Sequence, residues 1–271
     1  MAGEGIEPGT AYKAGLLGST RPARLFFENR VVFPVCDARG RVLGFGGRKI
    51  GDEDGPKYIN TRETAVFRKH DCLFGLNKAL VPAQKSKRVI AVEGYIDVIR
   101  MAQAGLPETV AGQGSSVDLT ALDRAFPFVQ RRYFLLDGDA GGQSGNDRMI
   151  DQALRSSASG KIYLFTPMPA GQDPDSFVGE AGPEAMHELL EKQSVDLAEA
   201  VWRRSIRRAA SLGLYDGKPE AVVGLIDEIS EAIETIEDAQ VRSWYETYMS
   251  GRVEVTYGPR KTLQDLRSRF A

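Results

Sequence analysis

Residues that commonly bind metals or form cross-links are scarce in this sequence. Its 271 residues include only two cysteines, Cys36 and Cys72, and two histidines, His70 and His187. So few cysteines and histidines exclude a disulfide framework and a complete Cys/His zinc site, so we expect no zinc in this chain. Any metal site has to be sought among oxygen-bearing side chains.

Long apolar runs are missing as well. No stretch approaches the roughly 18 residues of a membrane span, and residues 1–17 contain acids but no continuous apolar core. The hydrophobic share of 42% and the charged share of 27% are ordinary for a soluble globular protein. The sequence therefore predicts neither a membrane contact nor a secretory signal, and we expect a cytoplasmic protein.

Charge is unevenly spread along the chain, although the net charge is only −2. Residues 20–88 contain 15 Lys and Arg against 7 Asp and Glu, an excess of eight positive charges, so the remainder carries ten net negative charges. A basic first third joined to an acidic remainder suggests a polyanion bound by one end of the molecule. A solvated, lysine-rich face is the alternative interpretation.

The chain divides into three predicted parts. Residues 1–87 show short strand-like runs between turn signals, which predicts a basic α+β subdomain with a weakly ordered lead-in at residues 1–20. Over residues 88–181 the apolar runs RVIAV, YFLL and IYLF alternate with helical patterns, which predicts a parallel sheet covered on both faces. Residues 182–271 have apolar residues every three or four positions and predict a helical bundle as a separate subdomain. The fold class is thus mixed α/β, with a central parallel sheet flanked by helices.

Acidic side chains follow three of the predicted strands of this sheet. They are Glu93, Asp137 with Asp139, and Asp173 with Asp175. Because ligands bind at the carboxyl ends of parallel strands, we expect these acids at one sheet edge, joined by Asp97 one helical turn after Glu93. Carboxylates so close together repel one another, and hard divalent cations such as Mg²⁺ prefer oxygen ligands that would relieve this repulsion.

Each acidic element alone has a simpler interpretation. A lone Asp-Gly-Asp is more often an exposed turn, and Asp173-Pro174-Asp175 is most simply a turn before a helix with Asp175 as the N-cap. The order makes the set specific: strand-Glu-Gly, then strand-Asp-Gly-Asp, then a third acidic pair.

Several of these stretches resemble one known family. VEGYIDV and FLLDGDAGG look like the paired signature of the Toprim domain, and DPDSFV resembles the third acidic element of DnaG-type bacterial replicative primases. ENRVVFPVCDARGRVLGFGGRKI and GPKYINTRETAVFRKHDCLFGL are similar to the nucleic-acid and nucleotide-binding subdomain that precedes Toprim in those primases. The resemblance runs from about residue 24 to residue 180, and it points to the catalytic RNA polymerase core of this family.

The resemblance implies a DNA primase, which makes short RNA primers on single-stranded DNA from ribonucleoside triphosphates during DNA replication. It implies nucleotidyl transfer with two Mg²⁺ ions, or Mn²⁺ in their place. By the same carry-over Glu93, Asp137 and Asp139 are the main catalytic metal ligands, and Asp97, Asp173 and Asp175 are supporting acids. Glu93 as a general base is left open. The implied nucleotide and DNA contacts are Arg39, Arg41, Arg48, Lys57, Asn60 and Lys69, with Lys57 and Lys69 expected at the triphosphate and the arginines at template phosphates.

The implied partners are a single-stranded DNA template, ribonucleoside triphosphates and the hybrid of RNA primer and DNA. The match departs from the family because no C-x-x-C zinc ribbon is present, the similarity begins only near residue 24, and no helicase-binding domain is recognisable after residue 181. We therefore expect a replicative helicase to bind only through regions absent from this chain. The chain is either a fragment of a longer primase or a shortened form from a mobile element.

Other functions are weighed against this one. A Toprim-type metal-dependent nuclease would use the same acids, and a non-catalytic nucleic-acid-binding module would keep the fold alone. The basic stretch favours primase over nuclease, and the intact acids give no support to lost activity. A topoisomerase would need a further domain to deliver a nucleophilic tyrosine, and a dinucleotide-binding oxidoreductase would need a complete G-x-G-x-x-G motif.

Overall fold

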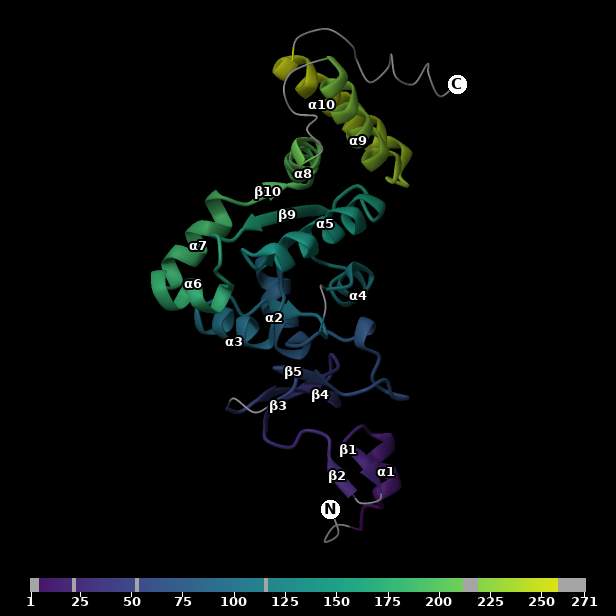
Figure 1. The fold of residues 1–271 in the computed structure, drawn as a ribbon, viewed down its shortest axis with the longest axis vertical. Coiled ribbons are helices and arrows are strands. Elements are labelled where there is room, and N and C mark those ends of the chain that lie inside the picture. Colours follow the sequence, from purple (N-terminus) through teal and green to yellow (C-terminus); the bar gives the residue numbers. More distant parts are fainter. Residues whose placement is uncertain (1–4, 21–22, 52–53, 115–116, 212–218, 258–271) are drawn as a thin grey trace.

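In the described part of the chain, three β-sheets follow one another: a two-stranded hairpin, a three-stranded antiparallel sheet and a five-stranded, mostly parallel sheet. The computed structural model describes residues 5–20, 23–51, 54–114, 117–211 and 219–257. The sheets lie in chain order along the long axis, and the last helices stand at the end opposite the hairpin (Figure 1).

The first two sheets are built from the basic part of the chain. Their elements are α1 (Pro8–Lys13), β1 (Leu17–Thr20), β2 (Ala23–Leu25), β3 (Arg30–Cys36), β4 (Val42–Lys49), β5 (Tyr58–Asn60) and the 3₁₀ helix η2 (Lys69–Asp71). Strand β4 is the centre of the three-stranded sheet, with Phe33 of β3 opposite Gly46 and Tyr58 of β5 opposite Arg48. The end of β4 that carries Arg48 therefore lies beside β5.

Residues 8–20 differ from the weakly ordered lead-in predicted there. Pro8 begins helix α1, a position where its missing N–H costs nothing, and Ala11 and Leu17 are buried. The Arg62 guanidinium lies 3.6 Å from the centre of the Tyr12 ring and donates to the Tyr12 carbonyl. The prediction is wrong for these residues because composition alone does not show these contacts; residues 1–4 lie outside the described part.

The large sheet has the strand order β10-β9-β8-β6-β7. Its elements and covering helices are α2 (Leu76–Ser86), β6 (Arg88–Val92), α3 (Tyr95–Gln103), β7 (Thr109–Ala111), α4 (Leu119–Ala125), β8 (Arg131–Leu136), α5 (Ala140–Arg155), β9 (Ile162–Pro167), α6 (Pro174–Ala181), α7 (Pro183–Lys192) and β10 (Val195–Asp196). Strands β6 to β9 pair in parallel, as predicted, whereas β10 pairs antiparallel with β9. The prediction of helices alone after residue 182 is thus wrong at β10, whose two residues pair with the edge of β9.

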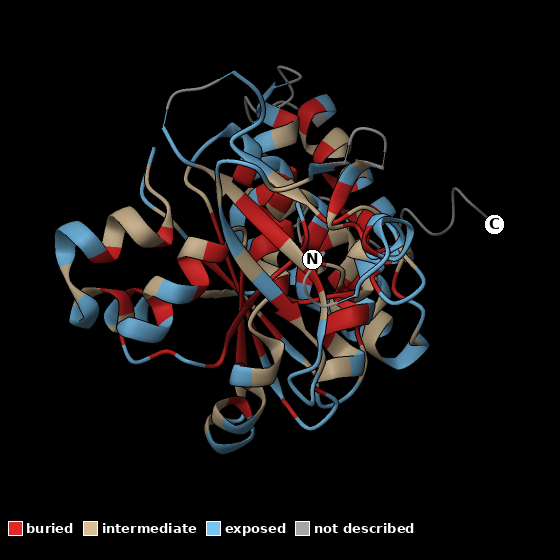
Figure 2. Ribbon diagram, turned by 90° about the horizontal axis from the view of Figure 1, so that it is seen from below, coloured by how far each residue is buried: buried red, intermediate tan, exposed pale blue. Residues whose placement is uncertain are grey.

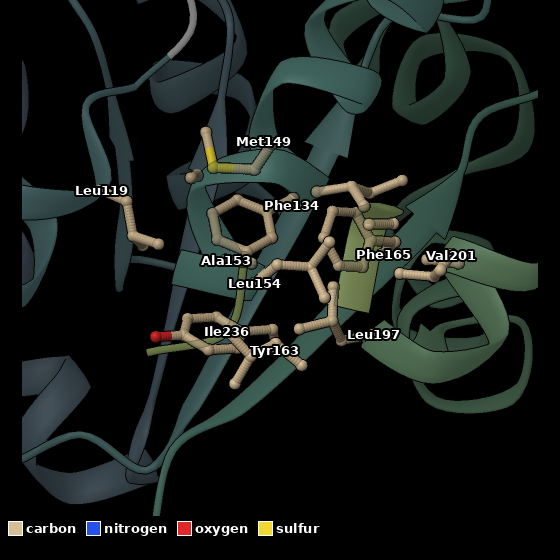
Figure 3. Packing of buried hydrophobic residues seen from close by; sticks show 14 of the residues in the cluster. Leu119, Phe134, Met149, Ala153, Leu154, Tyr163, Phe165, Leu197, Val201 and Ile236 are labelled. Carbon is tan, nitrogen blue, oxygen red and sulfur yellow. The ribbon is translucent and has the colours of Figure 1, made fainter. Parts of the chain in front are cut away.

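Helices cover both faces of this sheet, as the unbroken apolar strands predict. On one face Phe134 of β8 packs with Phe165 of β9, with ring centres 5.2 Å apart, and with Leu154 of α5 (Figure 3). On the other face Leu135 of β8 belongs to a cluster with Met101 of α3. Buried residues accordingly concentrate on the central strands (Figure 2).

The helices after residue 182 share these two cores with the sheet. Leu189 of α7 belongs to the cluster on the α3 face, and Val201 of α8 (Leu197–Ser211) packs on the opposite face. Helices α9 (Pro219–Glu234) and α10 (Ala239–Tyr257) then pack on α8. The subdomain boundaries at residues 87 and 181 remain predictions. Across the described ranges, no helix is both long and apolar enough to span a membrane.

Candidate active site

The Asp-Gly-Asp stretch forms a tight loop at the carboxyl end of β8. The Gly138 N–H donates to the Gln172 carbonyl at 2.8 Å, and the Gly138 carbonyl accepts from the Gly171 N–H at 2.9 Å. A Cβ on Gly138 would lie 1.9 Å from the Pro169 carbonyl oxygen, closer than any real contact. Glycine is required here because the loop after β9 passes directly over the loop after β8.

Helix α5 begins at the second acid of this loop. Asp139 is the N-cap, and its Oδ1 accepts from the Gly142 N–H at 2.8 Å. A Cβ on Gly142 would lie 2.0 Å from the carbonyl oxygen of Asp137, so this glycine lets the helix start against the loop. The backbone therefore fixes the positions of both aspartates.

Glu93 lies beside Asp137 because their strands, β6 and β8, are parallel neighbours. The Asp137 N–H donates to Glu93 Oε1 at 3.1 Å, across 44 residues of sequence. The structure thus brings the first two predicted acidic elements into direct contact.

Asp97 is almost buried, with 7% of its surface exposed. Its Oδ2 accepts from the Gly94 N–H at 3.0 Å, and its Oδ1 accepts from the Asp175 N–H at 3.3 Å. Burial, and then the negative charge of Asp173, raise the pKa of Asp97 to about 6. The carboxyl group of Asp97 therefore joins the loop after β6 to the start of α6.

The pKa of Asp137 is raised further, to about 7. Burial is the largest cause, and the strongest repelling charge is that of Glu93, followed by those of Asp97, Asp173 and Asp139. The Oδ1 atom of Asp137 is buried and has no hydrogen-bond partner among the described residues. This buried oxygen of Asp137 therefore has no hydrogen-bonded or cationic partner among the described residues.

The third acidic pair divides into two different environments. Asp173, rather than the predicted Asp175, is the N-cap of α6, because its Oδ1 accepts from both the backbone N–H and the hydroxyl of Ser176 at 2.7 Å. Burial raises the pKa of Asp173, but these hydrogen bonds outweigh it and the net pKa is lowered. Asp175 instead pairs with Arg100, with Nε and Oδ1 2.6 Å apart.

Acids and basic residues meet in one cleft of about 390 Å³. Five of the predicted acids line it, namely Glu93, Asp97, Asp137, Asp173 and Asp175. Three predicted nucleotide or DNA contacts from the three-stranded sheet line it too, namely Arg48, Lys57 and Asn60. The positive charge of Lys57 is one of the influences that lower the pKa of Asp173, so the two sets interact electrostatically.

Four predicted site residues lie elsewhere. Arg39 and Arg41 sit at the tip of the β3–β4 hairpin, where Arg41 pairs with Asp37 at 2.7 Å and 72% of its side chain is exposed. Lys69 lines a separate pocket of about 160 Å³. Asp139 lines a neighbouring cleft of about 470 Å³, and Asp137 lies between the two clefts and lines both.

Three further residues of the site were not predicted from the sequence. Tyr95 lines the cleft and contacts Gln113, which lines the separate pocket of Lys69, and Arg100 neutralises Asp175. Tyr95 had a signal, because it directly follows the Glu-Gly element and a buried tyrosine hydroxyl needs a polar partner. No sequence pattern pointed to Arg100, because its partner Asp175 is 75 positions away in the sequence.

The unpaired Oδ1 of Asp137 allows a test of whether this acid set fits a divalent cation. A buried anionic oxygen without a partner is costly, and Mg²⁺ or Mn²⁺ is a suitable partner for carboxylate oxygens. Within the described ranges, no three His, Cys, Asp or Glu side chains converge closely enough to hold an ion by themselves. The acids still fit Mg²⁺, which takes one or two carboxylates and completes its shell with water and substrate phosphates.

Both the basic and the acidic side of this cleft lie in regions that match known protein families. Residues 1–80 match the family model of the DNA primase catalytic core, N-terminal domain, and residues 90–178 match a Toprim-like model. The DNA primase of Rickettsia prowazekii is 33% identical over 247 residues, which are 89% of this chain but 40% of that protein. The chain therefore spans less than half the length of this relative.

Solved structures agree with the sequence matches. The DnaG primase catalytic domain solved with single-stranded DNA has a TM-score of 0.80 at 28% identity and covers 94% of this chain and 77% of that one. A DNA primase domain from Pseudomonas aeruginosa has a TM-score of 0.82 at 32% identity, over 93% of this chain and 76% of that one. A fold and sequence shared to this extent place the chain in the family of DnaG-type DNA primases.

Proposed function

We propose that this chain is the primer-synthesising core of a DNA primase. In this role it acts as a DNA-directed RNA polymerase, a nucleotidyltransferase that joins ribonucleoside triphosphates into short RNA primers on single-stranded DNA during replication. The observation that carries the proposal is the single cleft in which five carboxylates face Arg48 and Lys57. A nuclease needs the acids, whereas a polymerase also needs a cationic subsite for the incoming triphosphate.

We assign the metal ligands to Glu93, Asp137 and Asp139, with Asp97, Asp173 and Asp175 as supporting acids. Bound Mg²⁺ or Mn²⁺ would activate the primer 3′-hydroxyl and neutralise the departing pyrophosphate. The chain supplies rigidity for this chemistry, because Gly138 ties the loop to the Gln172 carbonyl and Asp139 is held by the start of α5. Such preorganisation keeps reacting groups in productive geometry.

The basic side of the cleft has a different task. Lys57 and Arg48 lie 5.9 Å from the centre of the Tyr58 ring and carry the positive charge that would bind a triphosphate. We assign Arg39, Arg41 and Lys69, outside the cleft, to the template or to more distant phosphates. Contacts of this kind provide salt-sensitive affinity without sequence readout.

The partners of the proposed function are the DNA template, ribonucleoside triphosphates and the hybrid of primer and template. The solved DnaG neighbour bound to single-stranded DNA supports the template. We place the chain in the cytoplasm, where its template is, and we propose that a replicative helicase binds through regions outside this chain.

The test is primer synthesis on single-stranded DNA with labelled ribonucleotides and Mg²⁺ or Mn²⁺. We expect metal-dependent RNA product from the unsubstituted chain, and a loss of about 1000-fold in Asp137→Ala, the scale of removing a group that stabilises a transition state. The matched control is Asp227→Ala, an exposed aspartate of α9, which should retain full activity.

Two results would contradict the proposal. Degradation of the DNA without nucleotide incorporation would assign the acids to a nuclease. DNA binding without either reaction would instead indicate a non-catalytic nucleic-acid-binding module.

A further inference from the structure

Tyr95 lies where the three-stranded sheet meets the parallel sheet. It is the first residue of α3, and only 4% of its surface is exposed. Its hydroxyl oxygen is 2.6 Å from Oδ1 of Asn60, in β5, and 2.5 Å from Oε1 of Gln113, just after β7. One hydroxyl group therefore joins the basic sheet to the loop region of the carboxylate sheet.

The ring of Tyr95 is held tightly, so the position of this hydroxyl is fixed. Its centre is 4.6 Å from that of Phe74 and 5.6 Å from that of Phe33, with Tyr58 at 6.4 Å. A Cβ on Gly46 would lie 2.1 Å from the ring, so glycine at this point of β4 makes room for it. The ring of Tyr95 makes the packing contacts, whereas its hydroxyl makes only the polar contacts with Asn60 and Gln113.

The hydroxyl carries one proton, so it cannot donate to both amide oxygens. In the described part of the chain Nε2 of Gln113 has no partner, although it is buried. If the Gln113 amide is turned by half a rotation, Nε2 donates to the Tyr95 oxygen, which in turn donates to Oδ1 of Asn60. This arrangement pairs the buried donor and runs as one chain from Gln113 through Tyr95 to Asn60.

The consequence for Asn60 is that its oxygen is occupied and its Nδ2 is available. Asn60 lines the cleft beside Arg48 and Lys57, and its Nδ2 lies near Gly114, where a Cβ would come within 2.9 Å of it. Arg48, Lys57 and Asn60 then all offer hydrogen-bond donors to a ligand in the cleft. Such a surface suits the acceptor oxygens of a nucleotide.

We infer that Tyr95 is a positioning residue for nucleotide binding, which acts by fixing the Asn60 amide with Nδ2 toward the nucleotide. This inference rests on the proposed function. Without the hydroxyl, the Asn60 amide would turn and present its oxygen to the nucleotide oxygens, where it repels instead of binding. The loss should then appear in nucleotide affinity rather than in the chemical step.

The test is Tyr95→Phe, which removes the hydroxyl and keeps the ring. We expect the Kd for a fluorescent ribonucleoside triphosphate with Mg²⁺ to rise about fivefold, the scale of one hydrogen bond. KM in primer synthesis should rise in parallel, with kcat within about twofold. The matched control is Tyr163→Phe, because Tyr163 is also buried at 3% exposure and its hydroxyl, 3.1 Å from the Ser156 carbonyl, lies outside the cleft.

A double-mutant cycle separates this role from mere packing. In an Asn60→Ala background, Tyr95→Phe should have no further effect on nucleotide affinity, because the amide it positions is gone. An undiminished effect in that background, unchanged affinity in Tyr95→Phe, or an equal loss in Tyr163→Phe would overturn the inference. If the unsubstituted chain bound no nucleotide, the proposed function would fail and this inference with it.

Discussion

Two groups of basic residues lie in or beside the three-stranded sheet, Arg48 with Lys57 and Arg39 with Arg41, yet only the first group reaches the carboxylates. Arg48 lies near the end of β4 that is beside the cleft, whereas Arg39 and Arg41 lie at the hairpin tip before Val42. Strand β4 has eight residues, so at about 3.3 Å per residue its ends are roughly 20 Å apart. Arginines that are close in sequence are thus separated in space by the length of strand β4.

The two groups also differ in how strongly their charge acts. The pair between Arg41 and Asp37 is exposed, and such pairs contribute little and are screened by salt. Lys57, by contrast, acts on Asp173 within the cleft, where the acids are partly buried. We therefore predict that position on the sheet, rather than the number of positive charges, decides which basic residues bind a nucleotide.

After the loss expected in Asp137→Ala, the largest expected effect comes from disturbing the loop that brings the acids to the cleft. In Gly138→Ala the new Cβ would meet the Pro169 carbonyl, so the loops after β8 and β9 must move apart. We expect primer synthesis to fall at least about 100-fold, because misplacing catalytic groups by about 1 Å has that cost. The matched control is Gly179→Ala in α6, where a Cβ meets nothing and activity should remain. Retained activity in Gly138→Ala would contradict the geometry described for this loop.

A smaller effect concerns the stability of the cleft without metal. The pKa of Asp137 is about 7 in the fold against 3.8 as its ordinary value, so the folded state keeps a proton that the unfolded chain has lost. In the presence of a chelator, the free energy of unfolding should therefore decrease as the pH rises from about 4 to about 7. Asp97, with a pKa of about 6, contributes in the same direction.

Asp137→Asn should remove part of this pH dependence. Because Asp137 is only half-buried, solvent screening limits the gain at pH 8 to about 1 kcal/mol, or about 2–4 °C in Tm. Added Mg²⁺ should stabilise the unsubstituted chain more than the variant and so narrow the difference. Thermal melts with EDTA and with Mg²⁺ measure both effects, and a variant less stable than the unsubstituted chain in EDTA would argue against charge repulsion at this site.

One physical reason makes both the parallel sheet and the close approach of its acidic side chains predictable from the sequence. Apolar runs such as YFLL specify buried strands, and the topology of parallel strands brings their carboxyl ends together. Glu93 and Asp137 are therefore neighbours although they are 44 positions apart in the sequence. The family resemblance could be recognised because these short motifs coincide with the strand ends.

Other features depend on contacts that no local pattern reveals. Asp139 lies in a different cleft from Glu93 because the chain turns into α5 at that residue. Lys57 and Lys69 are both predicted at the triphosphate, but only Lys57 enters the cleft that holds the acids. Likewise, the hydroxyl partners of Tyr95, Asn60 and Gln113, become visible only when the two sheets are placed against each other.

The most direct test of this account is the affinity of a labelled ribonucleoside triphosphate, with Mg²⁺, for Lys57→Ala and Arg39→Ala side by side. Both substitutions remove one positive charge, so general attraction is matched between them. We expect the Kd to rise about fivefold for Lys57→Ala, which loses a charge in the cleft, and less than about twofold for Arg39→Ala at the tip. Equal losses, or the larger loss in Arg39→Ala, would contradict the claim that nucleotide and carboxylates meet in this cleft.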